Sequence, residues 1–162
     1  MTRNRAIALA AGGSMAMLLA AWGFEYIGGL APCKLCYWQR WPHIAAVVIG
    51  IVALGASLRL LALLGASAAA TTAGVGLYHT GVERGWWPGP SSCSGGGGMG
   101  DMTGAELLST EGVGSVVMCD QVAWSLFGLS MASWNMLVSL LFVGLWIHAA
   151  LRRETQVQNV PA

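Results

Sequence analysis

Charged side chains are scarce in this sequence. Only 9% of its 162 residues are Asp, Glu, Lys or Arg, whereas 56% are hydrophobic. A soluble domain usually carries about 25% charged residues, so this chain has too few of them to cover a water-facing surface. The charges also leave four uncharged runs, at residues 6–24, 41–58, 60–82 and 121–151. This distribution excludes a soluble globular domain and indicates membrane-spanning segments.

The uncharged runs predict an all-α integral membrane protein, a four-transmembrane-helix bundle that forms a single domain over residues 1–162. A spanning helix needs about 20 predominantly apolar residues. The predicted spans lie at about 6–25, 42–58, 61–81 and 134–151. Two loops on one side of the membrane, at about 26–41 and 82–133, complete the chain. The second span is short, but it contains an unbroken apolar run from Ile44 to Leu54.

The basic residues predict the orientation of the bundle, because cytoplasmic loops carry an excess of Lys and Arg. With the N-terminus inside, five arginines fall on the inner face, at positions 3, 5, 59, 152 and 153, against Lys34, Arg40 and Arg84 outside. We therefore expect a multi-pass protein with both termini in the cytoplasm. All four cysteines, at positions 33, 36, 93 and 119, then lie on the outer side, where disulfides persist.

The first span has an alternative interpretation as a cleaved signal peptide, because Arg3 and Arg5 precede an apolar core. The apolar run continues past a normal signal core, however, and Pro32 stands where a small residue would precede Cys33 in a lipoprotein cleavage site. We interpret the segment as a retained helix.

The stretch from Pro32 to Arg40 carries most of the recognisable chemistry. Proline is favoured at the first position of a helix, so we expect Cys33 and Cys36 to lie in an opening helical turn. There the unpaired N–H groups and the helix dipole favour the reactive thiolate. Arg40 would then share a face with Cys36, four residues earlier. Pro42 disfavours helix at the preceding residue and leaves open a helix start at that point.

Three interpretations of the cysteines compete. In a four-cysteine zinc site, Cys33 and Cys36 would supply one half, but Cys93 and Cys119 are separated by 25 residues and lack the usual close spacing. Two inert disulfides in a membrane scaffold form the second interpretation, although a ring closed across two residues adds little constraint. Thiol–disulfide exchange accounts for both pairs and their shared side. We expect exchange and no bound metal.

Two further segments of the second outer loop have a recognisable composition. The glycines at 95–98 are not followed by Lys and Ser or Thr, so they predict a flexible linker and not a phosphate cradle. Residues 121–129 place polar or small side chains at 121, 125 and 128 and are otherwise apolar. This pattern predicts a segment that lies along the membrane face.

Three motifs together resemble the DsbB family. They are Pro-Cys-x-x-Cys-x-x-x-Arg at 32–40, Tyr-His-x-Gly-Val-Glu at 78–83, and the widely spaced cysteines followed by Phe-Gly-Leu-Ser-Met-x-x-Trp-Asn at 127–135. The resemblance extends over about residues 6–151. Members of that family are bacterial inner-membrane proteins that reoxidise the periplasmic dithiol protein DsbA and pass electrons to quinone. The resemblance implies a quinone cofactor, ubiquinone before menaquinone, a thioredoxin-like DsbA-type partner, a surrounding lipid bilayer and no nucleic acid.

The resemblance also implies roles for the cysteines. Cys33 and Cys36 correspond to the pair close to the quinone, with Cys36 as the thiolate that engages the quinone ring. Cys93 and Cys119 correspond to the loop pair, with Cys93 as the target of the partner's nucleophilic cysteine. Cys119 would then exchange with Cys33.

Arg40 matches the family's quinone-associated arginine, and His79 matches a histidine that lines the quinone site. A permanently charged guanidinium can stabilise both a thiolate and a quinone oxygen that gains negative charge. The alternatives are a boundary arginine that reaches for water and a boundary histidine without a role. The vitamin K epoxide reductase-like family has similar chemistry, but there the loop pair precedes the Cys-x-x-Cys, which argues against it.

Overall fold

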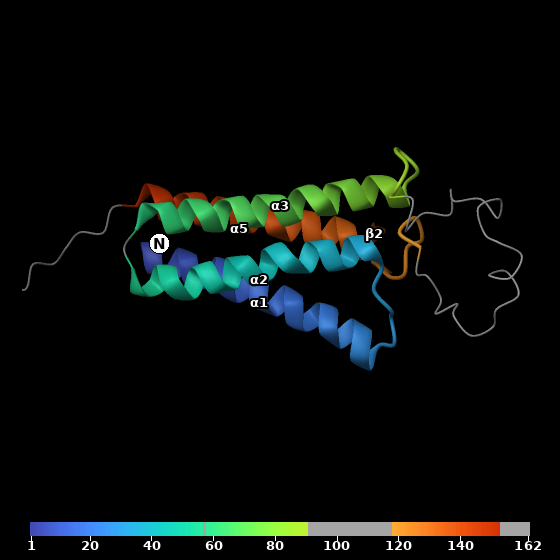
Figure 1. Cartoon of the computed structure of the whole chain (residues 1–162), viewed down its shortest axis with the longest axis horizontal. Helices are drawn as coiled ribbons and strands as arrows, with labels where there is room; N and C mark the ends of the chain where they lie inside the picture. Colours follow the sequence, from blue (N-terminus) through green and yellow to red (C-terminus); the bar gives the residue numbers. More distant parts are fainter. Residues whose placement is uncertain (57, 91–117, 153–162) are drawn as a thin grey trace, which may run out of the picture.

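The computed structural model describes residues 1–56, 58–90 and 118–152. Within these ranges the chain forms long helices, one short π-helix and a two-stranded hairpin. The elements are α1 (Arg3–Trp22), η1 (Gly23–Ile27), α2 (Lys34–Gly55), α3 (Arg59–Glu83), β1 (Ser125–Leu126), β2 (Leu129–Ser130) and α5 (Met131–Leu151). The N-terminus and the end of α5 lie at one end of the bundle, and the hairpin lies at the other (Figure 1). The described part of the chain is mostly helical, as predicted, with one short hairpin in addition.

Three helical stretches in the described part of the chain are long and apolar enough to cross a membrane: Arg3–Ile27, Arg59–Glu83 and Met131–Leu151. They correspond to the first, third and fourth predicted spans. The second predicted span, 42–58, overlaps the later part of α2, which ends at Gly55. The first ten residues of α2 include Lys34, Gln39, Arg40 and His43, which lower the hydropathy of the helix. That α2 also crosses the membrane therefore stays a prediction.

Helix α2 begins earlier than Pro42, which lies inside it. Cys33 is its N-cap, with extended backbone angles, and the Cys33 sulfur accepts a hydrogen bond from the backbone N–H of Cys36 at 3.3 Å. The expectation for Cys36 is met, because it lies in the first turn, but Cys33 lies just before that turn. The possible helix start at Pro42 is wrong. A proline inside a helix is tolerated where neighbouring helices support it, and α2 packs against α1 and α3.

Small residues bring the helices close together. Trp146 of α5 is fully buried, and a Cβ atom on Gly65 of α3 would come within 2.5 Å of its ring. Phe142 similarly occupies the space beside Gly13 of α1. Small residues at helix contacts are typical of membrane bundles.

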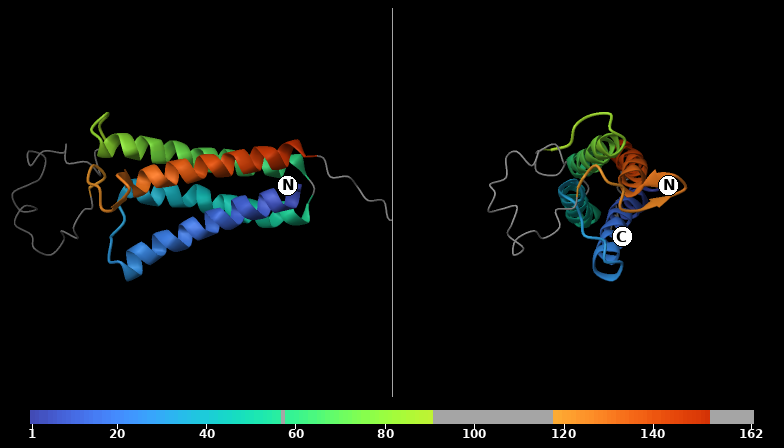
Figure 2. Two further views of the ribbon diagram at one scale, coloured as in Figure 1. Left: turned by 180° about the vertical axis from the view of Figure 1, so that it is seen from behind. Right: turned by 90° about the vertical axis from the view of Figure 1, so that its right-hand side faces the viewer.

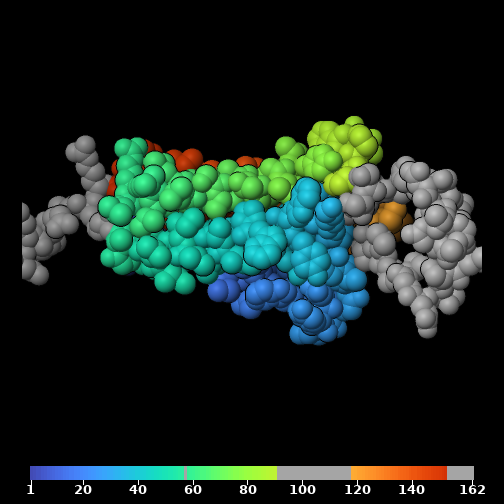
Figure 3. All heavy atoms as spheres, viewed as in Figure 1, coloured from blue at the N-terminus to red at the C-terminus, as the bar shows by residue number. Residues whose placement is uncertain are grey.

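Many large apolar side chains face outward instead of into the core. They include Leu9, Leu19, Val48, Ile51, Leu63, Leu140 and Leu141. The side chains of α2 and α3 form one continuous face of the molecule (Figure 3). An apolar exterior of this extent suits contact with lipid.

The segment 121–129, which was predicted to lie along the membrane face, contains part of a short hairpin; its position relative to the membrane stays a prediction. Ser125 pairs with Ser130 and Leu126 with Leu129 in an antiparallel hairpin. Phe127 and Gly128 have φ values of 52° and 75°, and positive φ at both central residues is characteristic of a type I′ turn. The glycines at 95–98 lie outside the described residues.

Helix α1 leans away from α2 and α5 towards the end that carries the hairpin (Figures 1 and 2). Phe24 of η1 contacts Trp124, which precedes the hairpin, with ring centroids 5.1 Å apart. The start of α2, with both of its cysteines, lies at this same end of the bundle. The fold therefore places the Cys-x-x-Cys motif where the helices diverge.

Candidate functional site

Cysteines from two distant parts of the chain meet at the start of α2. Cys33, Leu35, Val82 and Cys119 form one buried cluster, and Cys36 packs against it. Cys119 is fully buried and disulfide-bonded, whereas Cys33 and Cys36 carry free thiols. The structure thus brings three of the four predicted cysteines together. Cys93 lies outside the described residues.

The two thiols of the motif are in direct contact, with their sulfur atoms 3.0 Å apart. The Cys33 sulfur accepts a hydrogen bond from the Cys36 backbone N–H. It also lies within hydrogen-bonding distance of the Cys36 thiol and of the ring of His79, whose Nε2 lies 3.6 Å away. Hydrogen bonding from Cys36 and His79 outweighs burial and lowers the pKa of Cys33 to about 4. Negative charge in the reduced pair is therefore favoured on Cys33.

This charge distribution differs from the expected one, in which Cys36 is the thiolate. In the reduced pair Cys36 is the donor and Cys33 the acceptor. The role of Cys36 towards quinone stays a prediction, and it concerns a state in which the Cys33 sulfur is bonded elsewhere.

His79 is buried on α3 and points towards the cysteines. Its Nδ1 accepts a hydrogen bond from the Gln39 side-chain amide at 2.9 Å, and its Nε2 lies 3.8 Å from Oε1 of Glu83. Glu83 in turn accepts a hydrogen bond from the hydroxyl of Ser130 at the start of α5. The structure therefore places His79 beside Cys33 and not at an isolated boundary position.

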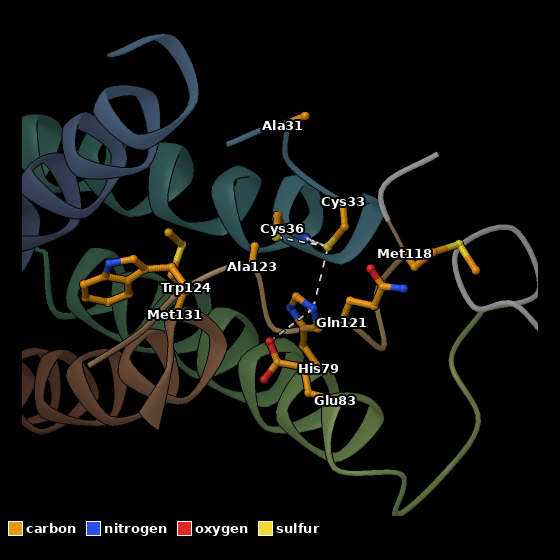
Figure 4. Close-up of a pocket in the computed structure, with 10 residues that line it drawn as sticks. All are labelled: Ala31, Cys33, Cys36, His79, Glu83, Met118, Gln121, Ala123, Trp124 and Met131. Atoms are coloured by element: carbon orange, nitrogen blue, oxygen red, sulfur yellow. Dashed lines mark hydrogen bonds and ion pairs between the residues drawn. The ribbon is translucent and has the colours of Figure 1, made fainter. Parts of the chain in front are cut away.

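A small cavity separates these groups from the hairpin segment (Figure 4). Its volume is about 30 Å³, and its walls include Cys33, Cys36, His79, Glu83, Trp124 and Met131. A single water needs about 10–15 Å³, and a cavity that binds benzene measures about 150 Å³. The thiol, imidazole and aromatic walls suit a flat redox-active ring chemically, but the cavity in this state is smaller than such a ring.

Arg40 lies on α2, four residues after Cys36. It forms an ion pair with Glu25 of η1, N–O 2.5 Å, and its guanidinium lies over the ring of Tyr37 at 5.0 Å. Its side chain is only 12% exposed, so it is held within the protein and does not extend into water. Arg40 does not line the cavity. Glu25 was not predicted, although it is the only acidic residue before Glu83.

A buried polar network behind the cysteines was not predicted from the sequence. Gln39 and His43 of α2 are 7% and 3% exposed. Nε2 of His43 donates to Oδ1 of Asn135 at 2.8 Å, and the Asn135 amide donates to the hydroxyl of Thr72 at 3.1 Å. Two features of the sequence could have indicated this network. The four-residue spacing of Gln39 and His43 puts both on one face of a helix, and polar groups at membrane depth are expected by default to have a function.

One metal-binding arrangement exists among the described residues. The two sulfur atoms of Cys33 and Cys36 and a ring nitrogen of His79 lie within 4.8 Å of one another. Two thiolates and one imidazole are zinc ligands in proteins. This set differs from the four-cysteine site considered from the sequence, and it would be available only while the Cys33–Cys36 pair is reduced.

Comparisons with known proteins agree with the geometry. A family model described as disulfide bond formation protein DsbB matches residues 3–149. A disulfide bond formation protein B of Polaromonas sp. (strain JS666) is 29% identical over 162 residues, which cover 93% of this chain and 94% of the relative. A protein of the same name from Verminephrobacter eiseniae (strain EF01-2) is 31% identical over 171 residues, with coverage of 99% and 94%. No solved structure shows significant similarity to the chain.

Proposed function

Because the chain belongs to the DsbB family of disulfide bond formation proteins, we propose that it oxidises a periplasmic, thioredoxin-like dithiol protein of the DsbA type and passes two electrons to a membrane quinone, ubiquinone before menaquinone. At the level of the family, the chain is a membrane-bound disulfide-forming oxidoreductase. The single observation that carries the proposal is the cluster in which disulfide-bonded Cys119 is buried with the free thiol of Cys33. Thiol–disulfide exchange requires such contact between the two pairs.

The first exchange takes place at the loop pair. A thiolate of the partner attacks Cys93 of a Cys93–Cys119 disulfide, and Cys119 leaves as a thiolate. The second thiol of the partner, deprotonated, then attacks the partner's own sulfur in the mixed disulfide and releases Cys93. The partner has lost two electrons and two protons and carries a disulfide, and the loop pair is reduced.

The second exchange takes place between the pairs. The Cys119 thiolate attacks Cys33 of an oxidised Cys33–Cys36 disulfide, and Cys36 leaves as a thiolate. In this state the Cys33 sulfur is bonded to Cys119, so the negative charge resides on Cys36, one helical turn before Arg40. Attack by Cys93 on Cys119 restores the loop disulfide and leaves Cys33 and Cys36 reduced.

A bound quinone would supply the final acceptor, because it takes up two electrons and two protons to become a quinol. Cys36 is half-buried on the cavity wall, and Trp124 and Met131 offer aromatic and thioether contacts there. The fixed charge of Arg40 favours the thiolate form of Cys36, and its pairing with Glu25 keeps the guanidinium close to the bundle. Because the cavity is smaller than a ring, binding requires its walls to separate.

We also propose a single membrane domain over residues 1–162 in the bacterial inner membrane, with four crossings, cytoplasmic termini and periplasmic cysteines. The helices support this topology. Helix α2 lies alongside α1 and α3, and the N-terminus and the end of α5 lie at the same end of the bundle (Figure 1). An even number of crossings is required for both ends to lie on one side.

The test is quinone reduction by the purified protein, followed by ultraviolet absorbance, with a reduced DsbA-type protein as the electron donor. We expect turnover in the parent and no detectable turnover in Cys36→Ser and Cys93→Ser. A Ser139→Ala variant is the matched control, because Ser139 is fully buried on α5 and has no hydrogen-bond partner for its hydroxyl in the described structure. It should retain activity.

A second electron donor, the small dithiol dithiothreitol, tests the electron path without the partner protein. Activity with dithiothreitol but not with the DsbA-type protein would contradict the proposed partner alone. Folded parent protein that reduces neither ubiquinone nor menaquinone with either donor would contradict the oxidase and support a disulfide-stapled membrane scaffold.

A further inference from the structure

The proposed function does not account for Gln39, a buried amide that contacts the site from inside the bundle. Its side-chain nitrogen lies 3.2 Å from the backbone oxygen of Leu35 and 2.9 Å from Nδ1 of His79. The Gln39 side chain is 7% exposed, and its amide reaches both a carbonyl and an imidazole. These two contacts restrict which ring nitrogen of the imidazole can carry a proton.

The Leu35 carbonyl fixes the orientation of the amide. A carbonyl oxygen can only accept a hydrogen bond, so the atom of Gln39 that faces it must be the NH₂ group. The same NH₂ group faces Nδ1 of His79. Nδ1 must therefore accept, and it carries no proton.

The proton of a neutral His79 then resides on Nε2, the other ring nitrogen. Nε2 lies 3.6 Å from the sulfur of Cys33 and 3.8 Å from a carboxylate oxygen of Glu83. Figure 4 shows the imidazole between these two groups. The ring thus presents its N–H to the sulfur that also accepts the backbone N–H of Cys36.

We propose that Gln39 is a positioning residue that holds His79 in the Nε2–H tautomer, so that His79 donates a hydrogen bond to the Cys33 thiolate whenever the Cys33–Cys36 pair is reduced. This role of Gln39 depends on the proposed function in one respect only, namely that the Cys33 thiolate takes part in turnover. A hydrogen bond to the charged form of an acid favours that form, so the amide, which does not touch either cysteine, acts on Cys33 through the ring.

The rest of the network fixes Gln39 itself. The hydroxyl of Thr72 on α3 donates to the backbone oxygen of Gln39 at 3.1 Å. Asn135 of α5 donates to that hydroxyl and to the Thr72 backbone oxygen, and it accepts from Nε2 of His43. Two neighbouring helices, α3 and α5, therefore hold the turn of α2 that carries the amide. Hydrogen bonds that are shared along a buried network favour one arrangement of its side chains, although Nδ1 of His43 has no partner among the described residues.

Other charged groups also act on the cysteines and must be held constant. Arg40, paired with Glu25, acts electrostatically on Cys36, and Glu83 faces His79 from the same helix. Cys119 is disulfide-bonded and does not titrate. Substitutions at Gln39 leave all of these groups in place.

The first test is nitrogen NMR of the reduced protein in micelles with labelled histidine, where a variant His79→Asn identifies the His79 signals among the three histidines. We expect Nδ1 of the parent to be unprotonated and Nε2 to be protonated. In Gln39→Glu the carboxylate can only accept, so Nδ1 should become protonated. A protonated Nδ1 in the parent would overturn the inference.

The second test measures the consequence for Cys33 in Gln39→Leu, which retains the volume but lacks the donor. Thiolate absorbance of the reduced protein as a function of pH should shift upward by about one to two pH units, the size expected for one hydrogen bond to a charged group. Ser139→Ala should not shift it. An unchanged midpoint in folded Gln39→Leu would overturn the inference.

Neither test uses quinone or a partner protein. If the parent fails to reduce quinone but both tests succeed, the proposed function is wrong and the role of Gln39 stands. If the parent is active and the tests fail, only the role of Gln39 is wrong.

Discussion

At the scale of single residues, the sulfur of Cys33 lies within hydrogen-bonding distance of groups from two helices. Two N–H groups and one S–H group converge on it. A Cys-x-x-Cys pair alone offers only the last of these and the backbone N–H, whereas His79 comes from a helix that is distant in the chain. The geometry thus makes the reduced pair a thiol and a thiolate at neutral pH, and not two thiols.

This asymmetry predicts how the reduction potential of the Cys33–Cys36 pair depends on pH. Because the pKa of Cys33 is lowered to about 4, reduction at neutral pH takes up two electrons but only one proton. The potential should fall by about 30 mV per pH unit, since a two-electron couple changes by that amount for each tenfold change in proton activity. The measurement is equilibration of a variant with Cys93→Ala and Cys119→Ala against dithiothreitol buffers of graded redox ratio.

Two protonated thiols would give a slope of about 59 mV per pH unit. That steeper slope around neutral pH would contradict a Cys33 thiolate.

The direction of the pKa shift of Cys33 also determines how the stability of the protein depends on pH. The folded, reduced protein should gain stability relative to its unfolded state as pH rises from about 4 to 9.0, because the lowered pKa makes the folded state release its proton first.

At the scale of the helices, the close contact between α3 and α5 depends on a glycine that leaves room for the ring of Trp146. Gly65 and Gly74 both lie on α3, but only Gly65 faces Trp146. A Cβ atom at Gly74 meets no atom within 4 Å, whereas one at Gly65 would come within 2.5 Å of the Trp146 ring. An added methyl group at Gly65 should therefore push α3 and α5 apart, whereas one at Gly74 on the same helix should not.

We expect Gly65→Ala to lower the free energy of unfolding by about 1–3 kcal/mol, the usual cost of an added group in a packed core. Gly74→Ala should be neutral or slightly stabilising, because alanine is the better helix former. Denaturant unfolding in detergent micelles, followed by tryptophan fluorescence, measures both. Equal destabilisation of the two variants would show that Trp146 does not occupy the space beside Gly65.

At the scale of the whole molecule, we expect α2 to cross the membrane together with its neighbours, because it packs alongside α1 and α3. Helix α2 is not among the stretches that are long and apolar enough to cross a membrane, and Gln39, Arg40 and His43 lie in its first half. In the structure these groups are partly or fully buried and bonded to groups on other elements, namely Glu25, His79 and Asn135. Burial of polar groups inside the bundle removes the cost of exposing them to lipid.

Topology reporters test this arrangement. Alkaline phosphatase, which is active only outside the cytoplasm, should be active when fused after Pro88 and inactive when fused after Leu58 or Arg152. Activity after Leu58 would show that α2 does not cross. The control is a fusion to green fluorescent protein at the same positions, which should be fluorescent only at the two cytoplasmic sites.

Much of this protein follows from the sequence alone. Scarcity of charge and the length of the apolar runs determine a helical membrane protein, and the spacing of Cys33, Cys36 and Arg40 determines that they share the start of one helix. These are local properties, since hydropathy and helical spacing depend only on residues close together in the chain. The family motifs are local for the same reason.

Only the tertiary structure decided which groups meet across helices. His79 beside Cys33, Glu25 on Arg40, and Gln39 behind His79 all depend on how each helix is rotated about its axis. In a soluble helix a polar face reveals that rotation, but helices that are apolar on both the lipid-facing and the core-facing side carry no such stripe. The rotation was set instead by small residues such as Gly65 and by buried polar pairs, which become visible only when the helices are placed together.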